Sequence, residues 1–309
     1  AGGDAQTMIG ANPFSNRVLA LSKDEQYLVN GSDSSTIQIY HLANTTSKVT
    51  NVPGHKGFVN DIKFLPDDSG FISVASDKTI RFTDPRTGQG RQLLALPFDL
   101  KSIDISPNGN LLVGSSSAGQ VVLVNLLNNT YEVIQDEAPN RARVLAVAFH
   151  PSRPLIAYGT EVLNEKNIPV RGIVKLFDLN EKKVTKELSG HSAGISDLQF
   201  SPDGLLLASA GLDRKLQMWV VDKELEDLPV VMDNNNGNIW SIQFTKDSNH
   251  LIASCNNGEI RVWPTDLRTL AEQICPKLVR NMTPEEWNIY VANGIPYETT
   301  CKSLLIKDF

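Results

Sequence analysis

Hydrophobic and polar positions alternate in short runs along most of the chain, and residues 190–219 show the pattern most clearly. An alternating run ends at Phe200, a second apolar run covers residues 205–208, and a third ends at Trp219. Turns rich in Pro and Gly separate these runs, for example Ser-Pro-Asp-Gly at 201–204. Period-two runs interrupted in this way indicate β-strands and would break a helix. The stretch predicts a three-stranded meander that opens on a Gly-His pair.

Weaker copies of this meander recur from Val18 to Trp263, with a period in the low forties. One step is longer because it contains an insertion at about 160–171. The period is measured between the last positions of the first strands, which are Leu21, Phe64, Ile105, Phe149, Phe200 and Phe244. A fixed period of this size, built from strands and turns, is typical of an all-β propeller, in which each blade buries its faces against its neighbours.

Polar residues at matching places in two of the units carry a family resemblance. One set resembles the His-Ser-Asp-Trp hydrogen-bonded tetrad of WD-repeat blades, and the other is similar but has Thr83 in place of the Trp. The two sets are His191, Ser209, Asp213 and Trp219, and His55, Ser73 and Asp77. A buried indole and imidazole need such hydrogen-bond partners. The resemblance covers residues 18–266 and implies a WD-repeat β-propeller.

The resemblance also bears on the size of the ring. Six meanders are present, and in WD-repeat propellers the outer strand of the last blade usually comes from the N-terminus. Residues 6–10 have the right length for that strand. We therefore predict six four-stranded blades over residues 1–266, with seven blades as the alternative.

Residues 267–309 differ in composition and predict a helical C-terminal tail packed on the propeller. Thr283-Pro284-Glu285-Glu286 forms a capping box, which marks the start of a short helix. The tail is similar to the segment that often closes WD-repeat regions in bacterial STAND-type signalling NTPases. This resemblance implies a sensor domain attached to a nucleotide-dependent switch. Cys275 and Cys301 flank the predicted helix, and two free thiols are the default expectation, with a disulfide as the alternative.

Composition and motif searches argue against several classes of function. The net charge of −6 shows no basic stripe for nucleic acid, and no apolar run is long enough to span a membrane. The five histidines lack metal-ligand spacing, so no metal or other cofactor is expected. Asp61 and Asp197 occupy matching strand positions and could be metal ligands of a channel-centred hydrolase, although hydrogen bonding within the strands is the favoured interpretation. We expect a cytoplasmic protein that is monomeric as an isolated domain.

Function is expected where the copies of the meander differ. A position four residues before the end of each first strand should surround the mouth of the central channel. Aromatic and Arg side chains there are typical of interface hot spots. These positions, the residues one or two places before them and the insertion suggest a partner-binding set. It consists of Arg17, Phe58, Lys101, Arg143, Trp240, Lys166 and Arg171. We expect a non-catalytic platform that binds a protein or peptide on its narrow face; the alternatives are the hydrolase and a purely structural or oligomer-forming module.

Overall fold

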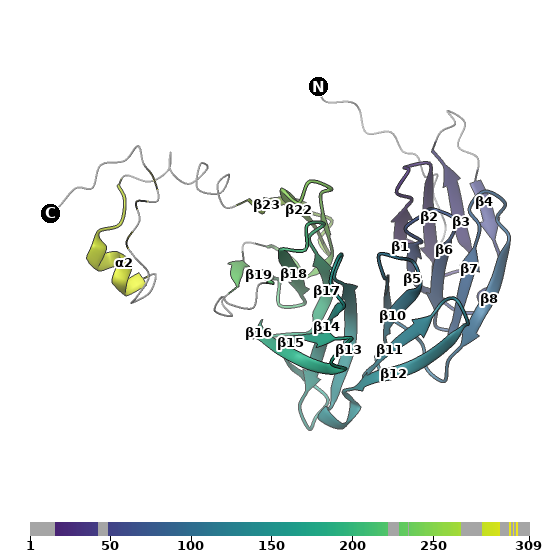
Figure 1. Cartoon of the computed structure of the whole chain (residues 1–309), viewed down its shortest axis with the longest axis horizontal. Coiled ribbons are helices and arrows are strands. Elements are labelled where there is room, and N and C mark those ends of the chain that lie inside the picture. Colours follow the sequence, from purple (N-terminus) through teal and green to yellow (C-terminus); the bar gives the residue numbers. More distant parts are fainter. Residues whose placement is uncertain are drawn as a thin grey trace.

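The structure, a computed structural model, describes residues 16–42, 49–221, 229–233, 235–266 and 280–290, together with residues 297, 299 and 301. It is nearly all β and forms a six-bladed propeller, as the sequence predicts. Blades one to three lie on one side in Figure 1, in purple to teal, and blades four to six lie on the other in green.

Each blade is an antiparallel meander that follows the order of the chain. Blade one contains β1 (Asn16–Leu21), β2 (Tyr27–Ser32), β3 (Ile37–His41) and β4 (Val49–Val52). Blade two contains β5 (Val59–Phe64), β6 (Phe71–Ala75), β7 (Thr79–Thr83) and β8 (Gly90–Ala95). Blade three contains β9 (Ser102–Ile105), β10 (Leu111–Ser115), β11 (Gln120–Asn125) and β12 (Thr130–Asp136), and a 3₁₀ turn, η1 (Ala138–Asn140), follows it.

The second half repeats the arrangement. Blade four contains β13 (Ala142–Phe149), β14 (Leu155–Leu163), β15 (Pro169–Asp178) and β16 (Lys183–His191). Blade five contains β17 (Ile195–Phe200), β18 (Leu206–Gly211), β19 (Leu216–Val220) and β20 (Val230–Met232). The described part of blade six has three strands: β21 (Ile239–Phe244), β22 (His250–Cys255) and β23 (Ile260–Pro264). The fourth strand predicted at 6–10 lies outside the described residues.

All six predicted ends of the first, inner strands are confirmed, from Leu21 of β1 to Phe244 of β21. One assignment was wrong. The Gly190-His191 pair does not open blade five but ends β16, the outer strand of blade four. A repeat of the sequence therefore joins two neighbouring blades, because its first residues pair in one sheet and the rest form the next.

The hydrophobic core of the described propeller contains five clusters, each buried between two successive blades. They join blades one and two, two and three, three and four, four and five, and five and six. Ile62, Leu112, Ile156 and Leu207 are typical members and are at most 1% exposed. Burial on this scale is the main favourable contribution to folding.

The insertion in blade four is a β-hairpin instead of the loop expected from the sequence. Its residues extend β14 and β15, with Glu161 opposite Gly172 and Val162 opposite Arg171. The Asn164 side chain closes the tip by accepting hydrogen bonds from the backbone of Lys166 and of Ile168. Paired backbones are stiffer than loops, so this hairpin is a defined arm.

The capped helix of the tail is confirmed as α2 (Pro284–Tyr290). Thr283 N donates to Glu286, and Glu286 N donates back to the Thr283 hydroxyl. Cys301 is disulfide-bonded and Cys255 is a free thiol, so the default of free thiols was wrong for Cys301. Cys275 lies outside the described residues, and the packing of 267–309 on the propeller stays a prediction.

Candidate partner-binding face

The antiparallel register places the starts of the inner strands and the turns between second and third strands on one face of the ring. In blade five, Ile195 at the start of β17 pairs with Gly211, which precedes that turn, while Phe200 pairs with Leu207 at the other end. We call this face the narrow face, following the prediction. The opposite face carries the turns between first and second strands.

Five of the six positions predicted to surround the channel mouth are β-bulges. The pairing register of the inner strand shifts at Arg17, Asn60, Leu145, Ser196 and Trp240. The sixth residue, Lys101, lies just before β9. A bulge leaves one residue unpaired and redirects its side chain, which is why such positions recur next to functional sites. The bulge is thus a physical reason why the residue type at this position differs from one repeat to the next.

Arg17 and Phe58 form a joint surface between blades one and two. The Arg17 guanidinium lies 5.6 Å from the centroid of the Phe58 ring and also pairs with Asp33 at 3.0 Å. Phe58 is nevertheless 51% exposed. An aromatic ring held in place while half exposed presents apolar area to a partner with little loss of conformational entropy.

Trp240 is the aromatic residue among these five bulge residues, and 58% of its surface is accessible. Lys101 is partly buried and forms an ion pair with Asp99 at 2.5 Å. Two other bulge residues serve the ring itself. Asn60 donates to the Leu100 carbonyl, and Ser196 donates to the Ile239 carbonyl, each in the next blade.

The blade-four arm adds exposed basic and apolar side chains. Lys166 and Arg171 are exposed, and Ile168 and Val170 between them are 53% and 47% exposed. At its base Arg143 pairs with the buried carboxylate of Glu161 at 3.3 Å. The pair orients Arg143, which is itself exposed. The structure does not gather all the predicted residues into one pocket; it distributes them around one face.

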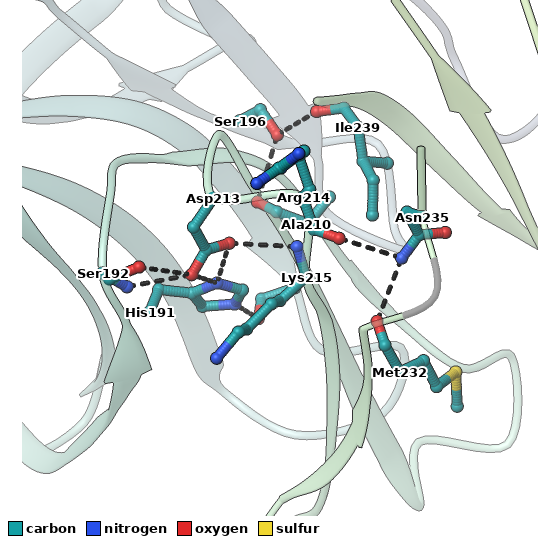
Figure 2. A network of polar contacts seen from close by, with 11 residues as sticks. His191, Ser192, Ser196, Ala210, Asp213, Arg214, Lys215, Met232, Asn235 and Ile239 are labelled. Carbon is teal, nitrogen blue, oxygen red and sulfur yellow. Dashed lines mark hydrogen bonds and ion pairs between the residues drawn. The ribbon is translucent and has the colours of Figure 1, made fainter. Parts of the chain in front are cut away.

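Three residues of the predicted tetrad form a buried polar triad that joins the outer strand of blade four to blade five. His191 Nε2 lies 2.7 Å from Ser209 Oγ. His191 Nδ1 lies 3.0 Å from Asp213 Oδ1 (Figure 2). Asp213 also accepts hydrogen bonds from the backbone of Ser192 and Lys215. Burial raises the pKa of Asp213, but the His191 hydrogen bond and charge and these two backbone bonds outweigh it, so the net pKa is lowered. The carboxylate stays ionised and fixes the turn to the preceding strand.

Trp219 is not part of this hydrogen-bonded set. Its ring is 2% exposed and packs edge-on against His191, with centroids 6.3 Å apart, but among the described residues its indole nitrogen has no acceptor within reach. The blade-five set is therefore a triad with a packed indole.

Blade two repeats the triad with His55. Its Nε2 lies 2.9 Å from Ser73 Oγ, and its Nδ1 lies 3.2 Å from Asp77. Burial lowers the pKa of His55 despite the neighbouring Asp77 carboxylate. His55 is thus a structural side chain and not an exposed acid or base.

Blade six replaces the histidine by Asn235. Its amide donates to the carbonyls of Arg214 and Met232 and so holds the preceding blade (Figure 2).

Blade four contains a buried network that sequence reasoning missed. Tyr158 stands where the triad has its Ser, and its hydroxyl donates to Glu137 at 2.8 Å. Lys175 donates to the same carboxylate oxygen at 2.8 Å, and Asn140 donates to the other. No sequence signal pointed to this network, because none of these residue types matches the repeat pattern. The network fixes the segment before β13 to the second and third strands of the blade.

Asp61 and Asp197 connect the inner strands of neighbouring blades. Asp61 accepts hydrogen bonds from the backbone nitrogens of Ile62 and Ile103, and Asp197 accepts from the next blade at Ile242. Asp104, which was not singled out from the sequence, does the same toward Phe149. Burial raises the pKa of Asp61 to about 6. These bonds confirm the favoured interpretation of the aspartates.

Lys63 lies among these aspartates and borders a cavity of about 140 Å³. Burial alone would lower the pKa of Lys63, but the negative charges of Asp61, Asp104 and Asp197 raise it by more. The net pKa is therefore raised, and Lys63 stays protonated. Within the described ranges, no three His, Cys, Asp or Glu side chains are placed to hold a metal ion. In the same part of the chain, no helix is long and apolar enough to cross a membrane.

Comparison with known proteins agrees with this architecture. The family model described as "WD domain, G-beta repeat" matches residues 46–84, 182–220 and 228–264. All three matches run from the outer strand of one blade to the third strand of the next: β4 to β7, β16 to β19 and β20 to β23.

The chain is 26% identical over 198 residues to the serine-threonine kinase receptor-associated protein of Gallus gallus, covering 64% of this chain and 53% of that protein. It is 24% identical to apoptotic protease-activating factor 1 of Rattus norvegicus, over 70% of this chain and 16% of that protein. It is 31% identical to the WD repeat-containing protein 89 homolog of Dictyostelium discoideum, over 43% of this chain and 36% of that protein. The matched region thus spans about half or less of these relatives. The chain is a β-propeller that carries WD40 repeats.

Proposed function

We propose that the protein is a non-catalytic interaction platform that binds a protein or peptide on its narrow face. WD40 repeat proteins generally act as protein-interaction scaffolds. The observation that carries the proposal here is the exposure of Trp240 and Phe58 on the same face of a rigid ring. Buried hydrogen bonds occupy the polar residues of the triads, whereas these aromatic rings have much of their surface free for a partner.

The charges of the narrow face suggest the kind of partner. Lys166 and Arg171 are exposed on the arm, and Arg143 is exposed at its base, in a protein of net charge −6. Arg17 adds a cation beside Phe58. A partner segment with apolar anchors and acidic residues between them would match both features.

The test uses a peptide selected from a random displayed library against the wild-type protein. Trp240→Ala should weaken its binding by about 1 to 2 kcal/mol, which is roughly fivefold to thirtyfold in Kd, because a hot-spot aromatic loses its packing. Lys101→Ala should act in the same direction. Folding should be unchanged, since Trp240 contributes little to the core. Titration calorimetry measures the affinity and thermal unfolding checks the fold.

Leu127→Ala is the matched control, because Leu127 is 75% exposed in a turn on the opposite face. This variant should bind the peptide like the wild type. Full-strength binding by both narrow-face variants would place the site elsewhere and contradict the proposal.

We further infer that this platform is the recognition domain of a larger signalling protein. The support is the resemblance of the tail to STAND-type NTPases together with its capping box. The similar proteins named above come from eukaryotes, so the bacterial origin is part of this proposal and rests on the tail alone. Expression as a fusion to a nucleotide-binding domain, with hydrolysis measured with and without the selected peptide, tests the sensor role.

A further inference from the structure

A groove of about 420 Å³ lies on the outer wall of the propeller where blades three and four meet, near the bottom of Figure 1. Apolar side chains form most of its lining, with one charged residue from each blade. The lining includes Leu123, Glu132, Ile134, Phe177, Leu179 and Lys182. Both blades lie wholly within the described range 49–221, so no undescribed segment interrupts the strands around the groove.

The same place at the next junction, between blades four and five, is filled by an indole. Trp219 and Phe177 correspond, because each pairs with the second residue of the second strand of its blade, Leu207 or Ile156. Trp219 is 2% exposed, and the space beside it is only about 10 Å³. Where blade five carries an indole, blade four carries the smaller phenyl ring, and an open groove remains beside it.

The apolar walls differ in the same way between the two junctions. Leu176 and Val221, which line the space beside Trp219, are 6% and 8% exposed. Their counterparts in the groove are Leu123 and Leu179, and both stay partly exposed at the edge of the core cluster. Partly exposed apolar side chains around a concave site of this size are typical of a binding site.

The surroundings of the groove favour a polypeptide as its occupant. Glu132 and Lys182 are exposed on opposite blades, and the nearby Glu181 pairs with Lys183 and not with Lys182. β12 is the outermost strand of its sheet, so its outer backbone edge can hydrogen-bond an extended segment. A site for an apolar ring with a cation, an anion and a strand edge around it matches a side chain on a peptide.

We propose that this groove binds a tryptophan side chain from an extended segment of a partner protein. The indole takes the place that Trp219 fills at the next junction. An acidic residue of the segment pairs with Lys182, and a basic residue pairs with Glu132. Lys182 lies in the turn between β15 and β16, at the end of blade four away from the narrow face. The groove is therefore a second contact site, and its binding does not depend on the narrow face.

Nuclear magnetic resonance of the methyl-labelled whole chain tests the proposal with two blocked peptides. They are Asp-Ser-Trp-Ser-Lys and the same residues in reverse order, which cover both chain directions. At least one should bind with a Kd on the order of 1 mM or below, as expected for a short ligand with one anchor. The methyl signals of Leu123, Ile134 and Leu179 should shift. Replacing the peptide Trp by Ala should weaken binding about tenfold or more.

Phe177→Trp supplies the indole from the chain itself and should abolish binding. Its melting temperature should equal or exceed that of the wild type, because filling a cavity commonly stabilises a protein. Lys182→Glu changes only an exposed side chain and should weaken binding by about threefold or more. The matched control Lys183→Glu should bind like the wild type, and so should Trp240→Ala, which separates this site from the narrow face.

Three results would overturn the proposal. The first is that neither peptide binds at millimolar concentration. The second is that the shifts are confined to methyl groups outside the groove. The third is that Lys182→Glu and a folded Phe177→Trp variant both bind with wild-type affinity.

Discussion

Two tryptophans illustrate how the same residue type takes opposite roles in this protein. Trp219 is 2% exposed and packs beside His191 between blades, whereas Trp240 is 58% exposed on a β-bulge. The sequence predicts the first from its place at the end of a third strand. It does not predict the exposure of Trp240, because an aromatic residue in an inner strand can be either buried or exposed. The bulge that exposes this side chain is visible only in the structure.

Asp213 is the residue of the blade-five triad whose removal should be most informative. Asp213→Asn should lower the free energy of unfolding at pH 7 by about 2 kcal/mol, because it removes a charged acceptor of several buried hydrogen bonds. The pKa of Asp213 is below its ordinary value of 3.8 in the folded protein. Its contribution is therefore complete above about pH 4 and is lost as the pH falls through the folded pKa.

Urea unfolding of wild type and variant from pH 7 to pH 3 measures this dependence. The difference between them should be constant down to about pH 4 and shrink below it. Glu132→Gln on the exposed side of β12 is the control and should follow the wild type throughout. A difference that stays constant or grows below pH 4 would show that the Asp213 charge does not stabilise the fold.

At the scale of elements, the sequence predicts strands well where both turn and burial signals are present. Each inner strand ends at a large apolar residue followed by a turn, and all six ends were found. The outer strands were harder to see. β8 and β12 have mostly exposed residues and no buried face, so the alternation that identifies a strand is absent. Their pairing comes from the neighbouring strand and not from their own pattern.

The blade-four arm shows the same limit and permits a prediction. Replacing residues 162–171 by Asn-Gly should give a tight two-residue hairpin between Glu161 and Gly172, which are paired in the native sheet. The free energy of unfolding should change by less than about 1 kcal/mol, because the removed side chains are mostly exposed. Affinity for the selected peptide should fall at least fivefold if the arm contributes its basic residues.

Urea unfolding and calorimetry check the two expectations separately. Replacing only 164–168 keeps Arg171 and serves as the intermediate control, whose affinity should lie between the wild type and the shorter variant. A loss of more than about 3 kcal/mol in either variant would mean that the arm belongs to the core of the blade.

At the scale of the whole molecule, the period of the sequence predicts a ring but not how blade six packs against blade one. Leu19, Leu21, Ile260 and Val262 are as apolar as the residues at the same places in blade five, so the hydrophobic pattern does not distinguish this junction from the others. That packing depends on contacts between residues that lie at opposite ends of the described propeller sequence. The distribution of the partner-binding residues around one face likewise follows from ring geometry.

The most direct test of the central claim, that the narrow face binds the partner, is the hydrogen-exchange footprint of the selected peptide on the wild-type protein. Binding should slow exchange at the narrow face, in the segments 56–60, 99–101, 141–145, 162–171 and 236–240. Slower exchange confined to the opposite face would contradict the claim; its segments are the turns 22–26, 66–70, 107–110, 201–204 and 245–249.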